Sequence, residues 1–112
     1  MNVVHLEESF VTTNDLATVF ARISRIQRDL PTKEIRLNFA LFIVLVAYQG
    51  PTSYHDRSVA RKLMQAGIIK QVRKSKRQEE DLFEPANVEI QEILKQLQCN
   101  STDGTLFIRP PS

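Results

Sequence analysis

Apolar residues recur every three or four positions near both ends of the chain, which is the spacing of one face of an α-helix. Near the start, this pattern predicts a helix over about residues 14–29, with Asp15 in its first turn and a boundary at Leu30-Pro31. Near the end, it predicts a helix over about residues 88–98, which Asn87 can cap. The apolar stripes of these helices consist of Leu16, Val19, Phe20, Ile23 and Ile26 in the first and of Ile90, Ile93, Leu94 and Leu97 in the second.

The longest apolar run of the chain, FALFIVLVAY at residues 39–48, lies inside a further predicted helix. Thr32 can cap this helix, Glu34 lies in its first turn, and Gly50-Pro51 ends it after about Gln49. A strand over 39–48 is the alternative, because Phe, Ile and Val are common in strands, but the length and the caps favour a helix. We expect it to be the buried central helix of the domain, since its middle is apolar on every side. The run is too short to span about 30 Å of hydrocarbon, so no membrane partner is expected.

A short basic helix is predicted to follow the turn at residues 51–56. Either Ser53 or Asp56 can cap it, and Gly67 can end it, because glycine adopts a left-handed backbone at little cost. Its apolar stripe consists of Val59, Ala60, Leu63 and Met64.

A hairpin is predicted after this helix. Ile68-Ile69 begins the first strand, the polar residues 74–81 can form the turn, and Leu82-Phe83 begins the return strand. Further on, NSTDG at 100–104 is typical of a turn, and TLFIR at 105–109 predicts a short strand or an arm. The expected fold is therefore mainly α with a small β-hairpin, in a single domain over the 112 residues of the chain.

Charge is unevenly distributed along the chain. There are 15 Lys or Arg residues and 13 Asp or Glu residues, which gives a formal net charge of +2. Lys and Arg recur from Arg57 to Arg77 without an acidic residue among them, and Glu79, Glu80 and Asp81 follow. A local basic patch of this kind attracts phosphate more strongly than an even coat of charges would.

The order of these elements resembles the winged-helix (winged helix-turn-helix) DNA-binding family over about residues 33–98. The likeness is carried by the central helix that ends at Gly50-Pro51, by MQAGIIKQVRK at 64–74, and by LFEP at 82–85 before the last helix. It implies a winged-helix-like fold of about four helices plus a two-stranded wing, and binding to duplex DNA.

The chain departs from the family between the central helix and the wing, where the family has a positioning helix and a recognition helix. The interval from Gly50 to Ala66 accommodates one helix of about three turns and a short connection. Either the positioning helix is reduced to a turn at 51–55, or the helix-turn-helix is absent and the scaffold serves another purpose.

The resemblance makes the basic helix and the residues before it candidates for DNA contact, because a recognition helix reads bases from its exposed N-terminal part. Arg57 or Arg61 can donate to two acceptors of one guanine. The alternative is a solvated surface helix whose charges only keep the protein soluble. The candidate DNA-binding residues of this region are Ser53, Tyr54, His55, Arg57, Ser58, Arg61 and Lys62.

The hairpin tip supplies further candidates, Lys74, Lys76 and Arg77, which can bind phosphates or reach into the minor groove. The alternative is a hydrophilic turn whose charges lie in water and are partly neutralised by the acidic residues 79–81. Those acids would also lie close to the phosphates.

A homodimer is expected from the apolar stripes of the first and last helices, because one small domain has little interior for all of its elements. Pairing through such flanking helices would duplicate the basic helix for a two-fold DNA site. The alternative is that both stripes complete the core of the monomer.

Catalytic chemistry has little support in the sequence. His5, His55 and Cys99 are scattered, and no Gly-rich phosphate loop, Cys-x-x-Cys or zinc-ligand spacing is present. We therefore expect no enzyme activity, cofactor or metal. The single cysteine excludes an intramolecular disulfide, and MNVVHLEESF lacks the pattern of a secretory signal. A cytoplasmic or nucleoid-associated location is expected.

The sequence thus predicts a dimeric regulator of transcription or replication that binds duplex DNA through a basic helix and wing. The alternative is a protein-interaction module on the same scaffold, of viral or plasmid origin, that binds a partner protein instead. The basic residues between 57 and 77 favour the first interpretation. The short helix-turn-helix interval and the acids at 79–81 favour the second.

Overall fold

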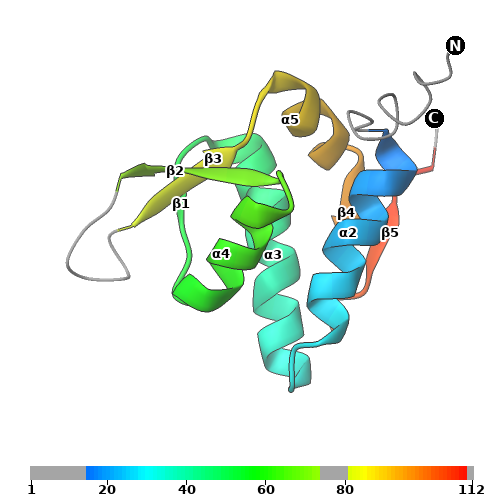
Figure 1. The fold of residues 1–112 in the computed structure, drawn as a ribbon. Helices are drawn as coiled ribbons and strands as arrows, with labels where there is room; N and C mark the ends of the chain where they lie inside the picture. The colour runs from blue at the N-terminus through cyan, green and yellow to red at the C-terminus, as the bar shows by residue number, and fades with distance from the viewer. Residues whose placement is uncertain (1–14, 74–80, 111–112) are drawn as a thin grey trace, which may run out of the picture.

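A computed structural model describes residues 15–73 and 81–110 and shows an α+β fold of helices and two small antiparallel sheets (Figure 1). The predicted helices and the predicted hairpin are present, and a second small sheet is added to them. The elements are α2 (Leu16–Arg28), α3 (Lys33–Gln49), β1 (Thr52–Ser53), α4 (Arg57–Gln65), β2 (Ile69–Arg73), β3 (Leu82–Pro85), α5 (Val88–Leu94), β4 (Leu97–Cys99) and β5 (Leu106–Ile108).

Each described helix begins at a polar side chain that satisfies one of its free backbone amides. Asp15, Thr32, Asp56 and Asn87 each accept a hydrogen bond from the backbone N–H of the residue three positions later. The predicted caps Thr32 and Asn87 are confirmed. Of the alternatives for α4, Asp56 is the cap and Ser53 is not. Asp15 caps α2 rather than lying in its first turn.

Helix α3 runs through the apolar segment without interruption, so the alternative of a strand over 39–48 is wrong. The helix ends at Gly50, whose φ of 82° is left-handed. One side of α3 forms the middle of the core, but the other does not, and the expectation of burial on every side is wrong there. Leu41, Leu45 and Tyr48 are 42%, 41% and 51% exposed.

The hairpin is confirmed as β2 and β3, which pair antiparallel with an irregularity between Gln71 and Arg73. The sheet also has a third strand that was not predicted. Thr52 and Ser53, expected in a turn, form β1 and pair with Phe83 and Leu82. The strand order is therefore β1-β3-β2, and β3 is the central strand. The expected hairpin tip, 74–80, lies outside the described residues.

The last helix is shorter than predicted. Helix α5 ends at Leu94, and the predicted extension to residue 98 is wrong, because Leu97–Cys99 forms β4 and pairs with β5. Antiparallel pairing with Leu106–Ile108 satisfies the backbone groups of this segment in place of helical bonds. TLFIR thus contains a strand rather than an arm, and a turn ending at Gly104, with a φ of 78°, joins the two strands.

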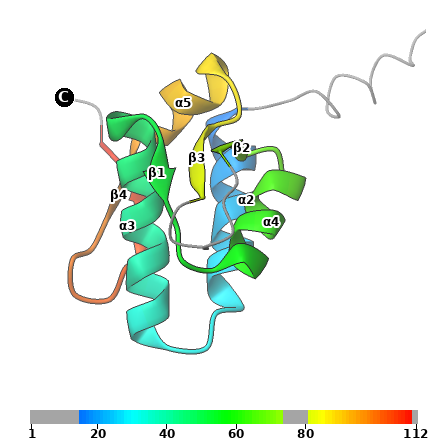
Figure 2. The same ribbon diagram turned by 90° about the vertical axis from the view of Figure 1, so that its left-hand side faces the viewer.

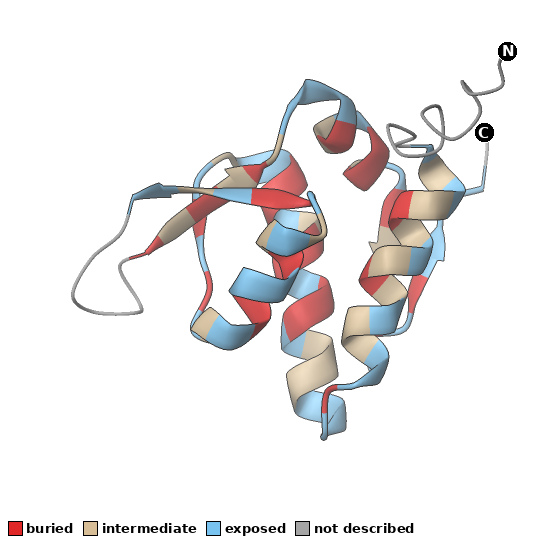
Figure 3. Cartoon of the chain, in the orientation of Figure 1, coloured by how far each residue is buried: buried red, intermediate tan, exposed pale blue. Residues whose placement is uncertain are grey.

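The core lies where α2, α3 and α4 pack together beneath the three-stranded sheet and α5 (Figures 2 and 3). The apolar stripes of the first and last helices contribute to it. Val19, Ile23, Ile90, Leu94 and Leu97 are fully buried within the single chain. These stripes therefore complete the core of the monomer, and a dimer would need another surface.

Within the described residues, no helix has both the length and the hydrophobicity needed to cross a membrane.

Candidate nucleic-acid interface

One side of helix α4 is buried against the rest of the protein, and the other side is exposed to solvent. Val59, Ala60 and Leu63 are buried and anchor the helix between α2 and the sheet, as their helical spacing predicted. The helix ends where predicted, because Gly67 adopts a φ of 79° and Ile68 N–H donates to the Leu63 carbonyl. The surface of α4 consists of Ser58, Arg61, Lys62 and Gln65, which are all exposed.

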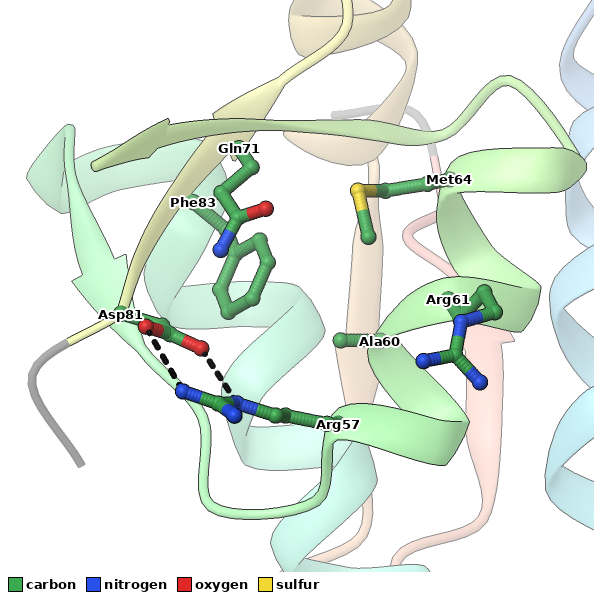
Figure 4. Close-up of a pocket in the computed structure, with 7 residues that line it drawn as sticks. All are labelled: Arg57, Ala60, Arg61, Met64, Gln71, Asp81 and Phe83. Atoms are coloured by element: carbon green, nitrogen blue, oxygen red, sulfur yellow. Dashed lines mark hydrogen bonds and ion pairs between the residues drawn. The ribbon is translucent and has the colours of Figure 1, made fainter. Parts of the chain in front are cut away.

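Arg57, at the start of α4, forms an ion pair with Asp81, just before β3 (Figure 4). Arg57 Nε donates to Asp81 Oδ2 at 2.8 Å, and Nη2 donates to Oδ1 at 3.4 Å. The Asp81 side chain is only 1% exposed, whereas that of Arg57 is 33% exposed. A buried carboxylate is stable only when it is paired, so this two-point contact fixes the N-terminal end of α4 to the sheet.

The ion pair changes how two predictions apply. Arg57 has its guanidinium directed at a carboxylate, whereas Arg61, also on α4, is exposed. Asp81 was expected to repel phosphate beside the hairpin tip. Its charge is instead buried and paired with Arg57, which reduces that repulsion.

A cavity of about 220 Å³ lies between α4 and the sheet, bordered by the ion pair (Figure 4). Its lining combines charged, amide and apolar side chains from both elements. Arg61, one turn after Arg57, also lines the cavity, and in Figure 4 no dashed line joins its guanidinium to Asp81. The lining residues are Arg57, Ala60, Arg61, Met64, Gln71, Asp81 and Phe83.

Tyr54 does not lie at the surface, so its predicted role in reading bases does not fit its position. The residue is 4% exposed, and its ring packs on Phe42 and His55, with ring centroids 4.5 Å and 4.7 Å away. The Tyr54 hydroxyl has no hydrogen-bond partner within the described part of the chain. Burial, assisted by the nearby charge of Asp56, raises the pKa of Tyr54 to about 12.

The remaining candidates fall into two groups. Ser53, in β1, and His55, after this strand, are exposed, and Ser58, Arg61 and Lys62 are exposed on α4. Lys74, Lys76 and Arg77 lie outside the described residues, and their contact with phosphate stays a prediction.

Sequence reasoning missed the basic residues of α2. Arg22 and Arg25 line a groove between α2 and α4 together with Lys62 of α4. The available signal was their spacing of three residues on α2, outside the buried positions Val19 and Ile23, on a helix that lacks acidic residues between its first and last positions. Only the fold places this face next to α4.

The described residues contain no group of three or more His, Cys, Asp or Glu side chains that could hold a metal ion. Cys99 lies in β4 and is half-buried, and burial raises the pKa of its thiol. This environment disfavours the thiolate, which is the nucleophilic form of cysteine.

Comparisons with known proteins find no matching family model, no matching curated protein and no matching solved structure. The function must therefore be inferred from the residues and their geometry. The feature on which we rely is α4, a helix anchored on its apolar side and uniformly basic among its charged residues.

Proposed function

We propose that the protein binds duplex DNA in a winged-helix-like manner, with α4 at the major groove and the β2–β3 hairpin as the wing. The observation that carries this proposal is the exposed side of α4. It presents Arg61 and Lys62 from a helix that has no acidic residue between Arg57 and Gln65. An exposed helix can enter the DNA major groove, where arginine and lysine can donate hydrogen bonds to guanine and bind phosphate.

The order of the elements supports the same proposal. A central helix, α3, is followed by β1, α4 and the β2–β3 hairpin, and α5 comes after the hairpin. A family member would have a positioning helix before the recognition helix, and here the interval holds the short strand β1. In this chain, pairing of β1 with β3 and the Arg57–Asp81 ion pair fix the start of α4 instead.

A regulator of transcription or replication that reads a two-fold site would act as a homodimer. The apolar stripes of α2 and α5 pack into the core of the monomer, so we propose that the dimer contact lies on α3. Leu41, Leu45 and Tyr48 form an exposed apolar stripe there, and α3 carries no charged residue after Arg36. The Leu41 and Leu45 part of the stripe brings no charge of α3 itself to the contact, whereas Lys95 and Arg109 lie beside Tyr48.

The second candidate function is a protein-interaction module that binds a partner protein instead of DNA. The observation in its favour is the same region of α3. Beside Leu41 and Leu45, an open groove of about 420 Å³ lies between α3 and β1, with Phe42 and Tyr54 among its lining residues. A groove of mixed polarity beside exposed leucines suits a protein partner, because interfaces combine apolar and polar contacts.

The test measures DNA binding by fluorescence anisotropy, with one duplex selected from a random library and one of random sequence. Arg61→Ala should weaken binding to the selected duplex by about 1–3 kcal/mol and relax the preference at one base pair. Binding to random DNA should change far less. Lys33→Ala is the matched control, because it removes one exposed positive charge at the start of α3, away from α4.

Equal losses on both duplexes would defeat base reading by Arg61 and leave only electrostatic attraction. A wild-type protein that binds neither duplex, even at low salt, would end the DNA proposal and favour the protein-interaction module.

A further inference from the structure

The surface between α2 and α4 has the features of an anion-binding groove. The groove has a volume of about 320 Å³ and is open to solvent along one side. Basic side chains of both helices border it, and apolar side chains form part of its wall. Its lining residues are Arg22, Arg25, Ile26, Asp29, Lys62, Gln65 and Ala66.

The two helices that form the groove are the source of its positive charge. Helix α2 carries Arg22, Arg25 and Arg28 and no acidic residue between its ends. The neighbouring α4 is equally free of acids between Arg57 and Gln65. The chain as a whole is nearly balanced in charge, so this is a local concentration. The groove lining has three cationic residues, Arg22, Arg25 and Lys62, and one carboxylate, Asp29. A cleft with an excess of positive charge favours an anionic ligand.

The basic side chains of the groove are available for a ligand. Within the described residues, no ion pair engages Arg22, Arg25 or Lys62. A carboxylate lies at each end of α2. Asp15, which caps α2, has its pKa lowered chiefly by its hydrogen bonds with Thr18, and Arg22 contributes to this. Asp29 lies at the other end of α2 and lines the groove there.

The outer surface of α2 carries small side chains, so a polymer backbone can approach it closely. Ala17, Thr18 and Ala21 line a second hollow, of about 440 Å³, together with Arg22 and Arg25. The two arginines thus border both hollows. Arginine is the side chain best suited to this position, because its planar fork can donate two parallel hydrogen bonds to one phosphate.

We propose that the α2–α4 groove binds phosphates of the nucleic-acid backbone, with Arg22, Arg25 and Lys62 as the contacting residues. This inference rests on the proposed DNA binding by α4 and extends that contact across to α2. Lys62 follows Arg61 directly and faces the groove, so one duplex can meet both Arg61 and the groove. Such contacts position the duplex and carry no sequence information.

The test compares the Arg22→Ala/Arg25→Ala variant with an Arg28→Ala/Lys33→Ala control, which removes the same charge from residues that line neither hollow. Affinity for a random-sequence duplex is measured over a series of salt concentrations. The slope of log affinity against log salt should fall by about 0.9 for each phosphate that the groove variant no longer neutralises, and stay near the wild-type value in the control. Arg22→Lys/Arg25→Lys keeps the charges and should retain most of the slope.

The possible failures are distinguishable. A groove variant that matches the control would overturn this inference while leaving DNA binding by α4 intact. A wild-type protein without any DNA binding would overturn both. If the groove variant binds DNA normally but loses binding to poly-glutamate, the groove serves an acidic polypeptide and the phosphate assignment is wrong. Unchanged thermal unfolding, followed by circular dichroism, shows that the variants are folded.

Discussion

Asp81 shows how one buried side chain changes the electrostatics of a whole surface. Unpaired, its carboxylate would lie beside the proposed wing and repel phosphate. Paired with Arg57 and shielded from water, it contributes little field outside the protein and holds α4 against the sheet. The exposed Arg61 and Lys62 are then the dominant charges at this part of α4.

Tyr54 is a residue whose substitution separates a structural role from a DNA-reading role. Its buried hydroxyl lacks a partner among the described residues, and an unsatisfied buried polar group is destabilising. We expect Tyr54→Phe to raise the free energy of unfolding by about 1 kcal/mol in urea titrations. Affinity for DNA should not change. A clear loss of affinity would mean that the Tyr54 hydroxyl contacts DNA.

The same residue predicts a pH dependence. The pKa of Tyr54 is raised to about 12 from an ordinary value of 10.0, so between these values the unfolded chain loses the Tyr54 proton while the folded chain keeps it. The contribution of Tyr54 to stability is therefore full below pH 10.0 and falls as the pH rises toward 12. Unfolding in urea at several alkaline pH values should show a smaller loss of stability in Tyr54→Phe than in the wild type.

At the scale of elements, Gly104 determines whether the β4–β5 hairpin can pack against α3. Its φ is +78°, and a Cβ placed there would lie 2.6 Å from the Cα of Leu37, in the backbone of the helix. Gln27 strengthens this contact, since its Nε2 donates to the carbonyls of both Arg36 and Gly104. This position therefore requires glycine for two reasons: its φ is positive, and a Cβ would clash with the backbone of α3.

Gly67→Ala provides the matched control for Gly104→Ala. Gly67 has nearly the same φ, +79°, but a Cβ there would meet nothing within 4 Å. Gly67→Ala should lower the free energy of unfolding by about 1–2 kcal/mol, the cost of a left-handed alanine. Gly104→Ala should lower it by clearly more, measured by urea titration. Equal effects would mean that the hairpin can move away from α3 at little cost.

The contrast between predicted and missed elements follows from the range of their interactions. Helix starts such as Thr32 and Asn87 depend on hydrogen bonds within one turn, so the local sequence predicts them. Strand β1 exists only because Thr52 pairs with Phe83, far away in the chain. Strand β4 depends in the same way on β5, and local helical periodicity misled the prediction there.

In the candidate site, too, the sequence predicts the features that depend on local contacts and misses those that depend on contacts between different elements. The exposed positions of Arg61 and Lys62 follow from the helical period of α4, and the sequence predicts them. The Arg57–Asp81 pair and the α2–α4 groove join residues of different elements, and no periodicity indicates such contacts. A buried Tyr54 was equally unpredictable, because its burial depends on how Phe42 meets the sheet.

At the scale of the whole molecule, the described surfaces differ in character. The α2–α4 side is basic, whereas the exposed side of α3 presents Leu41 and Leu45, with Lys95 and Arg109 beside Tyr48 at its C-terminal end. A protein that uses the first surface for DNA can use the second for a partner copy without competition between them. This separation suits a dimeric DNA-binding protein, in which both subunits must contact one duplex.

The dimer contact is expected on α3 and not on the buried stripe of α5 and β4. Leu94 and Leu97 are fully buried, so glutamate at either position should unfold the protein rather than yield a folded monomer. Leu41 and Leu45 are about two-fifths exposed, and Leu41→Glu/Leu45→Glu should leave the helical circular dichroism intact. In sedimentation equilibrium, this variant should be a monomer and the wild type a dimer, because two sets of glutamates would have to be desolvated against each other. Leu94→Glu serves as the control for unfolding. A wild type that stays monomeric at high micromolar concentration would end the dimer proposal, and a variant that still dimerises would remove the contact from α3.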